Sequence, residues 1–387
     1  MALSAVKEKL MAILQKICDQ LHRIKRAKVE RSKNPSGVLL VSSGGLGDTI
    51  LFSLIAPQFG ALAGDGEKVT VVMQHSSAAV EFLFPATFEI LPLNYRKFIR
   101  QPIYRYSFMD KIFSRNFRLS ISTDHLRLPT VDDTLIMAAN AQRSFALRPR
   151  SWPKHDDLLR KNRSVYTDWI EPAQGMAHRM IRWTEIASAL LKQDIQMPKV
   201  RFDEHLMPAL EKGASNYIVF HPFSNEAERN FSPAIWLKLA ENLSDGHEII
   251  LSVGPGDLKK YPEFKSLASL PGISVNTEGL KEKLALFHGA QLVITVDTSA
   301  LHLAVGCGAS TLCLASAAHT IDSIPYDERI CPDNVAFLFK DMPCAGCLGN
   351  CIHPLVSGRY ACIDAITPEQ IVNKALEVIH SPSNFKR

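Results

Sequence analysis

An acidic residue, Asp48, ends the glycine-rich turn SSGGLGD at residues 42–48. The turn follows a predicted buried strand, Val38–Ser42, and precedes a helix predicted from about Asp48 to Phe59. A carboxylate held at the end of a strand can accept the proton of a substrate hydroxyl group. It can equally well cap the helix, because a side-chain oxygen at this place accepts backbone N–H groups. Both interpretations of Asp48 remain open at this point.

The glycines of this turn do not follow the pattern of a phosphate-binding loop. A dinucleotide fingerprint needs a third glycine three residues after Gly47, and Ile50 stands there. A Walker A loop ends in Gly-Lys-Ser/Thr, whereas this chain has Asp48-Thr49 after Gly47. We therefore assign Gly45 and Gly47 to an acceptor loop, in which glycine allows a ligand to approach the backbone closely.

A second polar turn, DTSALH at residues 297–302, lies between a predicted buried strand and a predicted helix. The backbone N–H groups at the start of the helix, together with the Thr298 and Ser299 hydroxyls, favour an anion such as a diphosphate. His302, one turn into the helix, could donate a further hydrogen bond. The alternative is that Asp297 only caps the helix and that His302 is an ordinary buried polar residue.

One arginine, Arg229, lies in the polar loop of the segment HPFSNEAERNFSPAIW, residues 221–236. A cation there could balance the charge of a leaving diphosphate. Arginines in loops are more often simply solvated. Arg229 is therefore a candidate donor-binding residue only in combination with the turn at 297–302.

Five of the eight cysteines lie between Cys331 and Cys362. Four of them have a C-x2-C-x3-C-x10-C spacing, with His353 as a spare ligand: Cys344, Cys347, Cys351 and Cys362. This set would suit a structural zinc or iron ion with tetrahedral coordination. Reduced free thiols and a disulfide are the alternatives, and a cytoplasmic location disfavours the disulfide.

The elements that must position these residues fall into two α/β series, as expected for 387 residues. The first contains the β-α-β unit that ends with the strand Glu67–Gln74, and the second runs from NYIVFHPF at residue 216 to STLCLAS at residue 310. The pattern is lost around Pro198–Ser215, which we interpret as the linker. We predict two Rossmann-like domains whose parallel sheets face a central cleft, with ligands at the carboxyl ends of the strands.

The segment Lys7–Lys33 is rich in Lys and Arg, and its apolar residues recur at steps of three and four. This pattern predicts a basic amphipathic helix. The helix either packs on its own protein or touches an anionic membrane or a partner. There is no apolar run of eighteen residues and no signal peptide, so we expect a cytoplasmic protein, at most peripheral to the inner face of the membrane.

The net charge of +5 comes without a recognisable nucleic-acid-binding module, which argues against nucleic acid as a partner. The region Tyr95–Arg127 is rich in arginine, lysine and aromatic residues. It would suit an anionic, phosphorylated acceptor, or it is simply a solvated basic surface.

Together, these motifs resemble the heptosyltransferases of glycosyltransferase family nine. The resemblance rests on the Gly-Asp turn, the HPFSNEAERNFSP loop, IILSVGPGD and GAQLVITVDTSALHLAVGCGA, and it covers about Val38 to Ile379. It implies the two-domain GT-B fold, inversion at the anomeric carbon, no catalytic cofactor, and transfer of heptose from ADP-heptose to lipopolysaccharide core or a related acceptor. The alternatives are an autotransporter-type protein heptosyltransferase, an epimerase of this fold, and a non-catalytic sugar-nucleotide-binding protein.

The resemblance also assigns roles to individual residues. Asp48 matches the catalytic base, and Arg229 falls near the basic residue that contacts the donor phosphate. The diphosphate-binding turn corresponds to Thr298, Ser299, Ala300 and His302, supported by Asp297. Glu282 lies near an acid at the donor ribose, although Lys281 stands directly at that position. Ser299 replaces the family's usual glycine, and some relatives that act on autotransporters hold a structural iron with cysteines in this region.

The domain boundaries follow from the pattern and the resemblance together. Residues 1–34 form the helical extension and residues 35–200 the acceptor-binding domain. Residues 201–366 form the nucleotide-sugar-binding domain, with the cysteine cluster at 344–362, and residues 367–387 form a C-terminal helix and tail.

Overall fold

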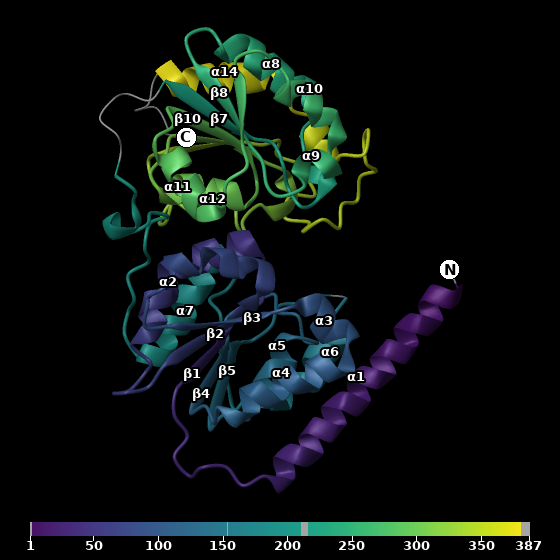
Figure 1. Cartoon of the computed structure of the whole chain (residues 1–387). Coiled ribbons are helices and arrows are strands. Elements are labelled where there is room, and N and C mark those ends of the chain that lie inside the picture. The colour runs from purple at the N-terminus through teal and green to yellow at the C-terminus, as the bar shows by residue number, and fades with distance from the viewer. Residues whose placement is uncertain (1, 153, 210–215, 381–387) are drawn as a thin grey trace. The chain divides into compact units, whose positions relative to one another are not determined.

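The computed structural model describes residues 2–152, 154–209 and 216–380, with side chains from residue 10 onward. The chain divides into two compact units (Figure 1). Unit 1 comprises residues 1–175 and 179–196, and unit 2 comprises residues 176–178 and 197–387. Each unit is built around its own six-stranded sheet.

The sheet of unit 1 is parallel throughout, with the order β3-β2-β1-β4-β5-β6. Its strands are β1 (Val38–Val41), β2 (Val69–Gln74), β3 (Glu89–Leu93), β4 (Leu119–Ser122), β5 (Arg143–Leu147) and β6 (Asp168–Ile170). All four residues of β1 are buried, because helices cover both faces of the sheet and its neighbours β2 and β4 flank it. This explains the unbroken apolar run that made β1 visible in the sequence.

The helices of unit 1 lie on both faces of this sheet (Figure 1). On one face, α2 (Leu46–Gly60) packs against α7 (Arg179–Leu191), where the rings of Phe52 and Trp183 meet edge to face. On the other, α4 (Pro102–Ser114) packs against α5 (Asp132–Ala139), with the short helices α3 (Tyr95–Arg100) and α6 (Asp156–Lys161) nearby. The long α1 (Ala2–Lys28) lies outside α4 and contacts it.

The sheet of unit 2 is also parallel, with the order β12-β11-β10-β7-β8-β9. Its strands are β7 (Tyr217–His221), β8 (Glu248–Ser252), β9 (Ile273–Asn276), β10 (Leu292–Val296), β11 (Thr311–Leu314) and β12 (Val335–Leu338). The helices are α8 (Pro233–Leu243), α9 (Asp257–Lys260), α10 (Lys265–Ala268), α11 (Leu280–His288), α12 (Ser299–Gly306), α13 (Ala361–Asp364) and α14 (Pro368–His380). Of these, α8 packs on α14, and α11 on α12.

The two sheets share one topology, in which the first strand of each unit lies beside the fourth. This is the strand order of dinucleotide-binding Rossmann sheets, and it creates a switch point between β1 and β4 in unit 1 and between β7 and β10 in unit 2. Ligands of such sheets bind at the carboxyl ends of the strands at this point. The predicted pair of Rossmann-like domains with parallel sheets is confirmed, and both predicted polar turns follow switch-point strands.

Some element boundaries differ from the expected ones. Helix α2 begins at Leu46, two residues earlier than predicted, because Gly45 is its N-cap. The N-terminal helix ends at Lys28 rather than Lys33. Within the predicted linker, Val200 and Phe202 are buried, and their N–H groups bond to unit 2 carbonyls. None of the described helices is both long enough and apolar enough to cross a membrane.

Candidate functional site

Asp48 caps helix α2 from within its first turn. Its Oδ2 accepts a hydrogen bond from the Gly45 N–H at 2.8 Å, and the Thr49 hydroxyl bonds to the Gly45 carbonyl at 3.0 Å. Because Gly45 has no side chain, only one half of a capping box is present, in which the Asp48 carboxylate accepts the N–H group of the N-cap residue. The capping role that the sequence left open for Asp48 is therefore real, and Gly47 lies in the same turn between Leu46 and Asp48.

The second carboxylate oxygen of Asp48 has a different partner. Nη1 of Arg179, the first residue of α7, lies 2.5 Å from Asp48 Oδ1. The Asp48 side chain is 26% exposed and that of Arg179 is 19% exposed, so the pair sits at the surface of unit 1. Capping uses Oδ2 of Asp48 and leaves Oδ1 at the carboxyl edge of the sheet. A ligand there could displace Arg179 from Oδ1, or could bind Oδ1 together with Arg179. Arg179 was not predicted as a site residue.

The position in this turn that requires glycine is Gly44, which precedes the predicted Gly45. A Cβ atom on Gly44 would lie 2.5 Å from the Asp48 Cβ and 2.8 Å from its Oδ2, which is too close for any side chain. A Cβ on Gly45 would meet only Asp48 Oδ2, at 3.8 Å. The absence of a side chain at Gly44 thus allows Asp48 to fold back over the turn.

A second carboxylate supports the turn from beneath. Asp124 follows β4, and its Oδ2 accepts hydrogen bonds from Ser43 N at 2.7 Å, Gly44 N at 3.1 Å and Ser43 Oγ at 3.2 Å. Burial raises its pKa to about 6; the nearby charge of Arg179 lowers it and that of Asp48 raises it. The sequence prediction missed Asp124, which lies two residues after the end of β4.

Half of the eight Lys and Arg residues in the basic region Tyr95–Arg127 are neutralised within unit 1. Four of its arginines form ion pairs with carboxylates: Arg105 with Asp19, Arg115 with Glu89, Arg118 with Glu67, and Arg127 with Asp133. The last pair is fully buried, and Tyr166 donates a hydrogen bond to the same aspartate at 2.7 Å. These arginines hold the fold together, and the remaining cations of the region lie on exposed helix surfaces.

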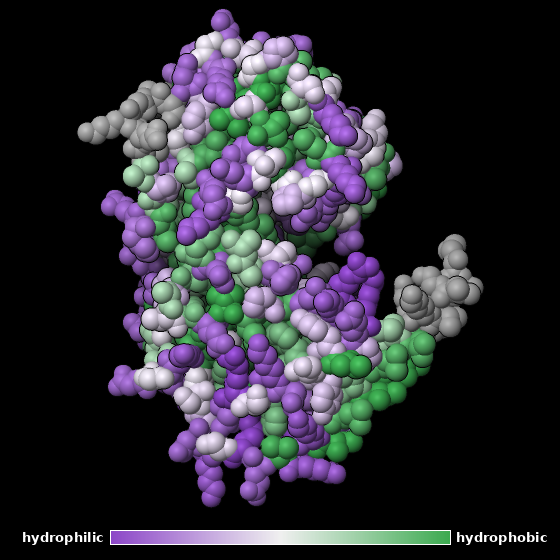
Figure 2. All heavy atoms as spheres, in the orientation of Figure 1, coloured by the Kyte–Doolittle hydropathy of each residue, from purple (hydrophilic) through white to green (hydrophobic). Residues whose placement is uncertain are grey.

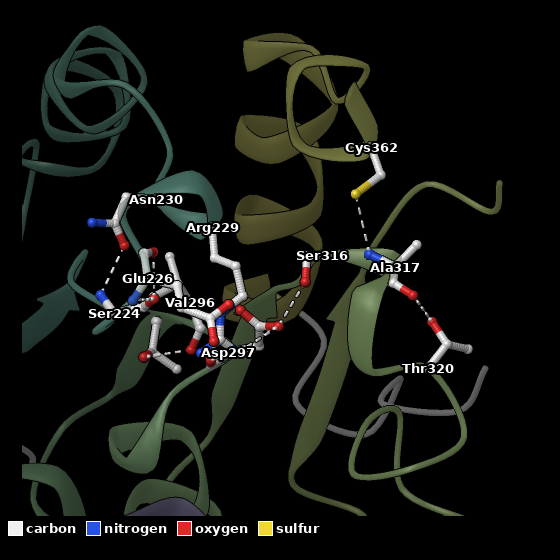
Figure 3. A network of polar contacts seen from close by, with 11 residues as sticks. Ser224, Glu226, Arg229, Asn230, Val296, Asp297, Ser316, Ala317, Thr320 and Cys362 are labelled. Atoms are coloured by element: carbon white, nitrogen blue, oxygen red, sulfur yellow. Dashed lines mark hydrogen bonds and ion pairs between the residues drawn. The ribbon is translucent and has the colours of Figure 1, made fainter. Parts of the chain in front are cut away.

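In unit 2, Asp297 lies at the centre of a polar network at the carboxyl end of β10 (Figure 3). Its Oδ2 accepts a hydrogen bond from Ser316 Oγ at 2.9 Å and lies 3.5 Å from Arg229 Nη1. The same arginine nitrogen donates to the Asp297 backbone carbonyl at 3.3 Å. Burial raises the pKa of Asp297, and the charges of Arg229 and His319 oppose this effect. The structure thus brings two predicted residues, Arg229 and Asp297, into direct contact.

One atom of this network is left without a protein partner. Asp297 Oδ1 is buried and accepts no hydrogen bond from any residue that the structure describes. A buried carboxylate oxygen in this state loses its hydration without compensation, so a ligand or an ordered water is expected to satisfy it. Arg229 is fixed on its other side by Glu226, whose Oε2 lies 3.3 Å from Arg229 Nε.

The turn after Asp297 presents some of its predicted residues outward and others inward. Thr298 is the N-cap of α12 in extended backbone, and its hydroxyl makes no capping bond. Thr298 and Ser299 are partly exposed, whereas Ala300 and His302 are buried. His302 Nδ1 lies 2.7 Å from the Tyr326 hydroxyl. Thr298, Ser299 and the first N–H groups of α12 therefore form the accessible surface, and His302 is a buried polar residue with a partner.

Glu282 lies on the first turn of α11, and both it and Lys281 are exposed. Their neighbour Lys283 points inward instead and donates to the Val253 carbonyl at 2.6 Å. Burial lowers the pKa of Lys283, and the charges of Asp257 and Glu278 oppose this effect. A buried cation at the end of β8 was not predicted.

The cysteine segment is attached to the loop that carries Ser316. Cys362 Sγ accepts the Ala317 N–H at 3.4 Å (Figure 3). The Gly346 N–H donates to the Ala317 carbonyl at 2.8 Å. A further backbone bond joins Leu348 N to Ala318 O at 2.8 Å. These three bonds fix the residues that directly follow Ser316, so the cysteine segment supports the Asp297 network from behind.

The four predicted metal ligands are only partly brought together. The Cys344 and Cys351 sulfurs lie 3.9 Å apart, a separation that two ligands of one tetrahedral ion could have. Within residues 2–152, 154–209 and 216–380, however, no group of three or more His, Cys, Asp or Glu is arranged to hold a metal ion. Cys362 is buried against Ala317, Cys347 packs on the core of unit 2, and His353 Nε2 is buried without a hydrogen-bond partner in the described chain.

Comparison with known proteins gives an independent view of the chain. Residues 156–330 match the model of "Glycosyltransferase family 9 (heptosyltransferase)". This match includes Arg179, Arg229 and the whole turn at 297–302. The search among curated proteins found no match.

Solved structures match over most of the chain. E. coli heptosyltransferase WaaC, with ADP-2-deoxy-2-fluoro heptose, is 18% identical with a TM-score of 0.62, covering 88% of this chain and 99% of its own. E. coli ADP-heptose lps heptosyltransferase II is 11% identical with a TM-score of 0.61, covering 89% and 99%. The iron-containing dodecameric glycosyltransferase TibC from enterotoxigenic E. coli is 14% identical with a TM-score of 0.53, covering 90% and 77%. The predicted resemblance to glycosyltransferase family nine and its GT-B fold is therefore confirmed, and the comparisons support glycosyltransferase activity.

Proposed function

We propose that this chain is an inverting glycosyltransferase that transfers heptose from ADP-heptose to lipopolysaccharide core or a related acceptor. In the proposed step, the acceptor hydroxyl oxygen attacks the anomeric carbon while the bond from that carbon to the diphosphate breaks. The hydroxyl proton passes to Asp48, and the nucleoside diphosphate leaves with the bonding electron pair. The observation that carries this proposal is the Arg229–Asp297 network at the switch point of unit 2.

The leaving diphosphate needs positive charge and hydrogen-bond donors. Arg229 is held from two sides by Asp297 and Glu226, so its guanidinium is already oriented. The Thr298 and Ser299 hydroxyls and the first N–H groups of α12 lie on the turn directly after Asp297, which contacts Arg229. Donors positioned before the reaction stabilise developing charge without reorganisation, which is usually the largest single contribution to catalysis.

Asp48 is the proposed general base, and Arg179 is its positioning residue. General base catalysis by a well-placed carboxylate contributes about 10²–10⁴-fold to the rate. The capping bond from Gly45 occupies Oδ2 of Asp48, so the proton must go to Oδ1. Oδ1 is paired with Arg179, so the acceptor hydroxyl must displace Arg179 or bind Oδ1 beside it. We propose that the bound acceptor takes over part of the Arg179 contact when it reaches Asp48.

The choice of donor rests on the solved relatives. WaaC has been solved with ADP and with ADP-2-deoxy-2-fluoro heptose, and TibC in complex with ADP-D-beta-D-heptose. We extend this chemistry to the present chain, with lipopolysaccharide core as the first choice of acceptor and a protein hydroxyl as the second. An anionic glycan would meet the exposed cations of unit 1 that are not in ion pairs.

Donor binding tests this proposal. Titration calorimetry with ADP should give an affinity in the millimolar range or better, and Arg229→Ala should weaken it about tenfold or more, as expected for loss of a charged hydrogen bond. Arg201→Ala removes an exposed arginine of the same unit and should have no effect. The proposal fails if wild-type protein binds no nucleoside diphosphate, or if both variants weaken binding equally.

A structural zinc or iron at Cys344, Cys347, Cys351 and Cys362 is a second, separate proposal. It is supported by the 3.9 Å separation of two sulfurs and by the iron in TibC. Such an ion would stiffen the segment behind Ser316 and take no part in the reaction. Elemental analysis of anaerobically purified protein should give about one ion per chain, as one four-thiol set implies, and a content near zero rejects the metal. A bound iron would also favour the protein acceptor, because the resemblance links a structural iron in this region to relatives that act on autotransporters.

A further inference from the structure

Helix α1 carries a stripe of exposed apolar side chains that has no role in the proposed reaction. The stripe consists of Leu10, Ile13, Ile17, Leu21 and Ile24, each between 43% and 54% exposed. Their spacing of three and four residues places them on one face of the helix. Figure 2 shows the corresponding hydrophobic band along α1. Single exposed apolar residues are ordinary, but five in one row form a patch that normally has a partner.

The apolar stripe is not the face that holds α1 to unit 1. Cys18 and His22 are buried on a different face of the helix, and Cys18 Sγ lies 3.3 Å from the Pro102 carbonyl. Ion pairs from α1 to α4 reinforce this attachment, at 2.6 Å between Asp19 and Arg105 and at 2.5 Å between Lys25 and Asp110. Because other residues anchor α1, its stripe remains available for an external surface.

Exposed positive charge lies on α1 and on the neighbouring helix α3. Lys16, Arg23 and Lys28 are exposed on α1 itself. The neighbouring helix α3, whose Ile99 carbonyl accepts a hydrogen bond from Gln15 of α1, adds three exposed cations, Arg96, Lys97 and Arg100. The only acid between residues 10 and 28 is Asp19, which Arg105 neutralises. The outer face of α1 is therefore apolar and cationic at once.

We propose that α1 docks unit 1 on an anionic lipid surface. The stripe would lie at the boundary between headgroups and acyl chains, with the cations of α1 and α3 over lipid phosphates, as in helices that lie in the membrane plane. Charge argues against a second copy of this chain as the occupant, because stripe-to-stripe contact would bring two cationic rims together. The inference goes beyond the proposed function and depends on α1 and α3 alone.

Vesicle flotation of the full chain without substrate tests this inference. The protein should float with vesicles that contain phosphatidylglycerol and much less with pure phosphatidylcholine, and binding should fall as salt rises from about 50 to about 500 mM. The double variant I17E/L21E should lose about tenfold or more in vesicle affinity, because two charges replace apolar contact. The control I352E changes a more exposed isoleucine of unit 2 and should bind like wild type.

A charge-reversal variant and a measure of oligomeric state complete the test. K16E/R23E should lose binding to anionic vesicles while it keeps its circular dichroism spectrum, since both side chains are exposed. The inference is overturned if wild type ignores anionic vesicles or if I17E/L21E binds as well as wild type. It is also overturned if light scattering finds a dimer without lipid that I17E/L21E dissociates. ADP binding, measured separately, distinguishes these failures from failure of the proposed function.

Discussion

Asp124, the carboxylate beneath the β1–α2 turn, is expected to make unit 1 less stable as the pH rises. Burial raises its pKa from 3.8 to about 6; Arg179 opposes the shift and Asp48 adds to it. The folded protein therefore holds this proton more tightly than the unfolded chain. The stabilising contribution of the protonated group is fully present below pH 3.8 and is lost as the pH rises through about 6.

The variant Asp124→Asn removes this titration and keeps an amide oxygen that can accept the Ser43 and Gly44 N–H groups. A pKa raised from 3.8 to about 6 corresponds to about 3 kcal/mol, of which about 2 kcal/mol is lost between about pH 4.5 and about pH 7.5. The free energy of unfolding of wild type, minus that of the variant, should fall by about 2 kcal/mol over this range. Urea denaturation followed by tryptophan fluorescence at a series of pH values measures it.

Glu67→Gln provides a matched control in the same unit. A hydrogen bond from Arg118 is the main cause that lowers the pKa of Glu67 from 4.5 to about 2. Its contribution is therefore fully present above pH 4.5 and is lost only as the pH falls toward 2, so its difference curve should be flat over most of the same range. A flat curve for Asp124→Asn, or one in which wild type gains stability as the pH rises, would refute the reasoning.

Two further sets of substitutions test the roles of individual residues in the proposed site. Gly44→Ala places a Cβ 2.5 Å from the Asp48 Cβ and should lower the transfer rate about a hundredfold or more. Gly45→Ala has room for its Cβ and should lower the free energy of unfolding by only about 1 kcal/mol. Steady-state kinetics and urea denaturation distinguish the two variants. Ser316→Ala removes the hydrogen bond to Asp297 Oδ2. It should lower the free energy of unfolding by about 1–3 kcal/mol and weaken ADP binding. An unchanged calorimetric affinity for ADP would contradict the role given to Ser316.

The turns of the candidate site could be found from the sequence because they follow buried parallel strands. Such strands are buried on both faces, so β1 is an uninterrupted apolar run and β10 is apolar except for Thr295, and a polar cluster directly after each strand is conspicuous. Asp124 lacked this signal, because β4 alternates Leu and Ile with Ser. The contact between Arg229 and Asp297 followed from the topology, because β7 and β10 are neighbours.

The partners of these residues could not be predicted, because they come from distant parts of the chain. Nothing in the local pattern around Arg179 indicates that it faces Asp48, and only the packing of α7 on α2 creates that pair. Charge count alone also suggested a basic acceptor surface at Tyr95–Arg127, where four arginines are in fact paired inside unit 1. Cysteine spacing likewise gives candidate ligands but no sulfur positions.

The most direct test of the central claim is the reaction of Asp48→Asn with ADP-heptose and a lipopolysaccharide core acceptor. Asparagine keeps an oxygen for the Gly45 capping bond but cannot take a proton from the acceptor. The proposed mechanism predicts that transfer falls by about 10²-fold or more while the affinity for ADP stays near that of wild type. A variant that binds ADP normally and transfers sugar at the wild-type rate would show that Asp48 only caps α2, and that the base lies elsewhere.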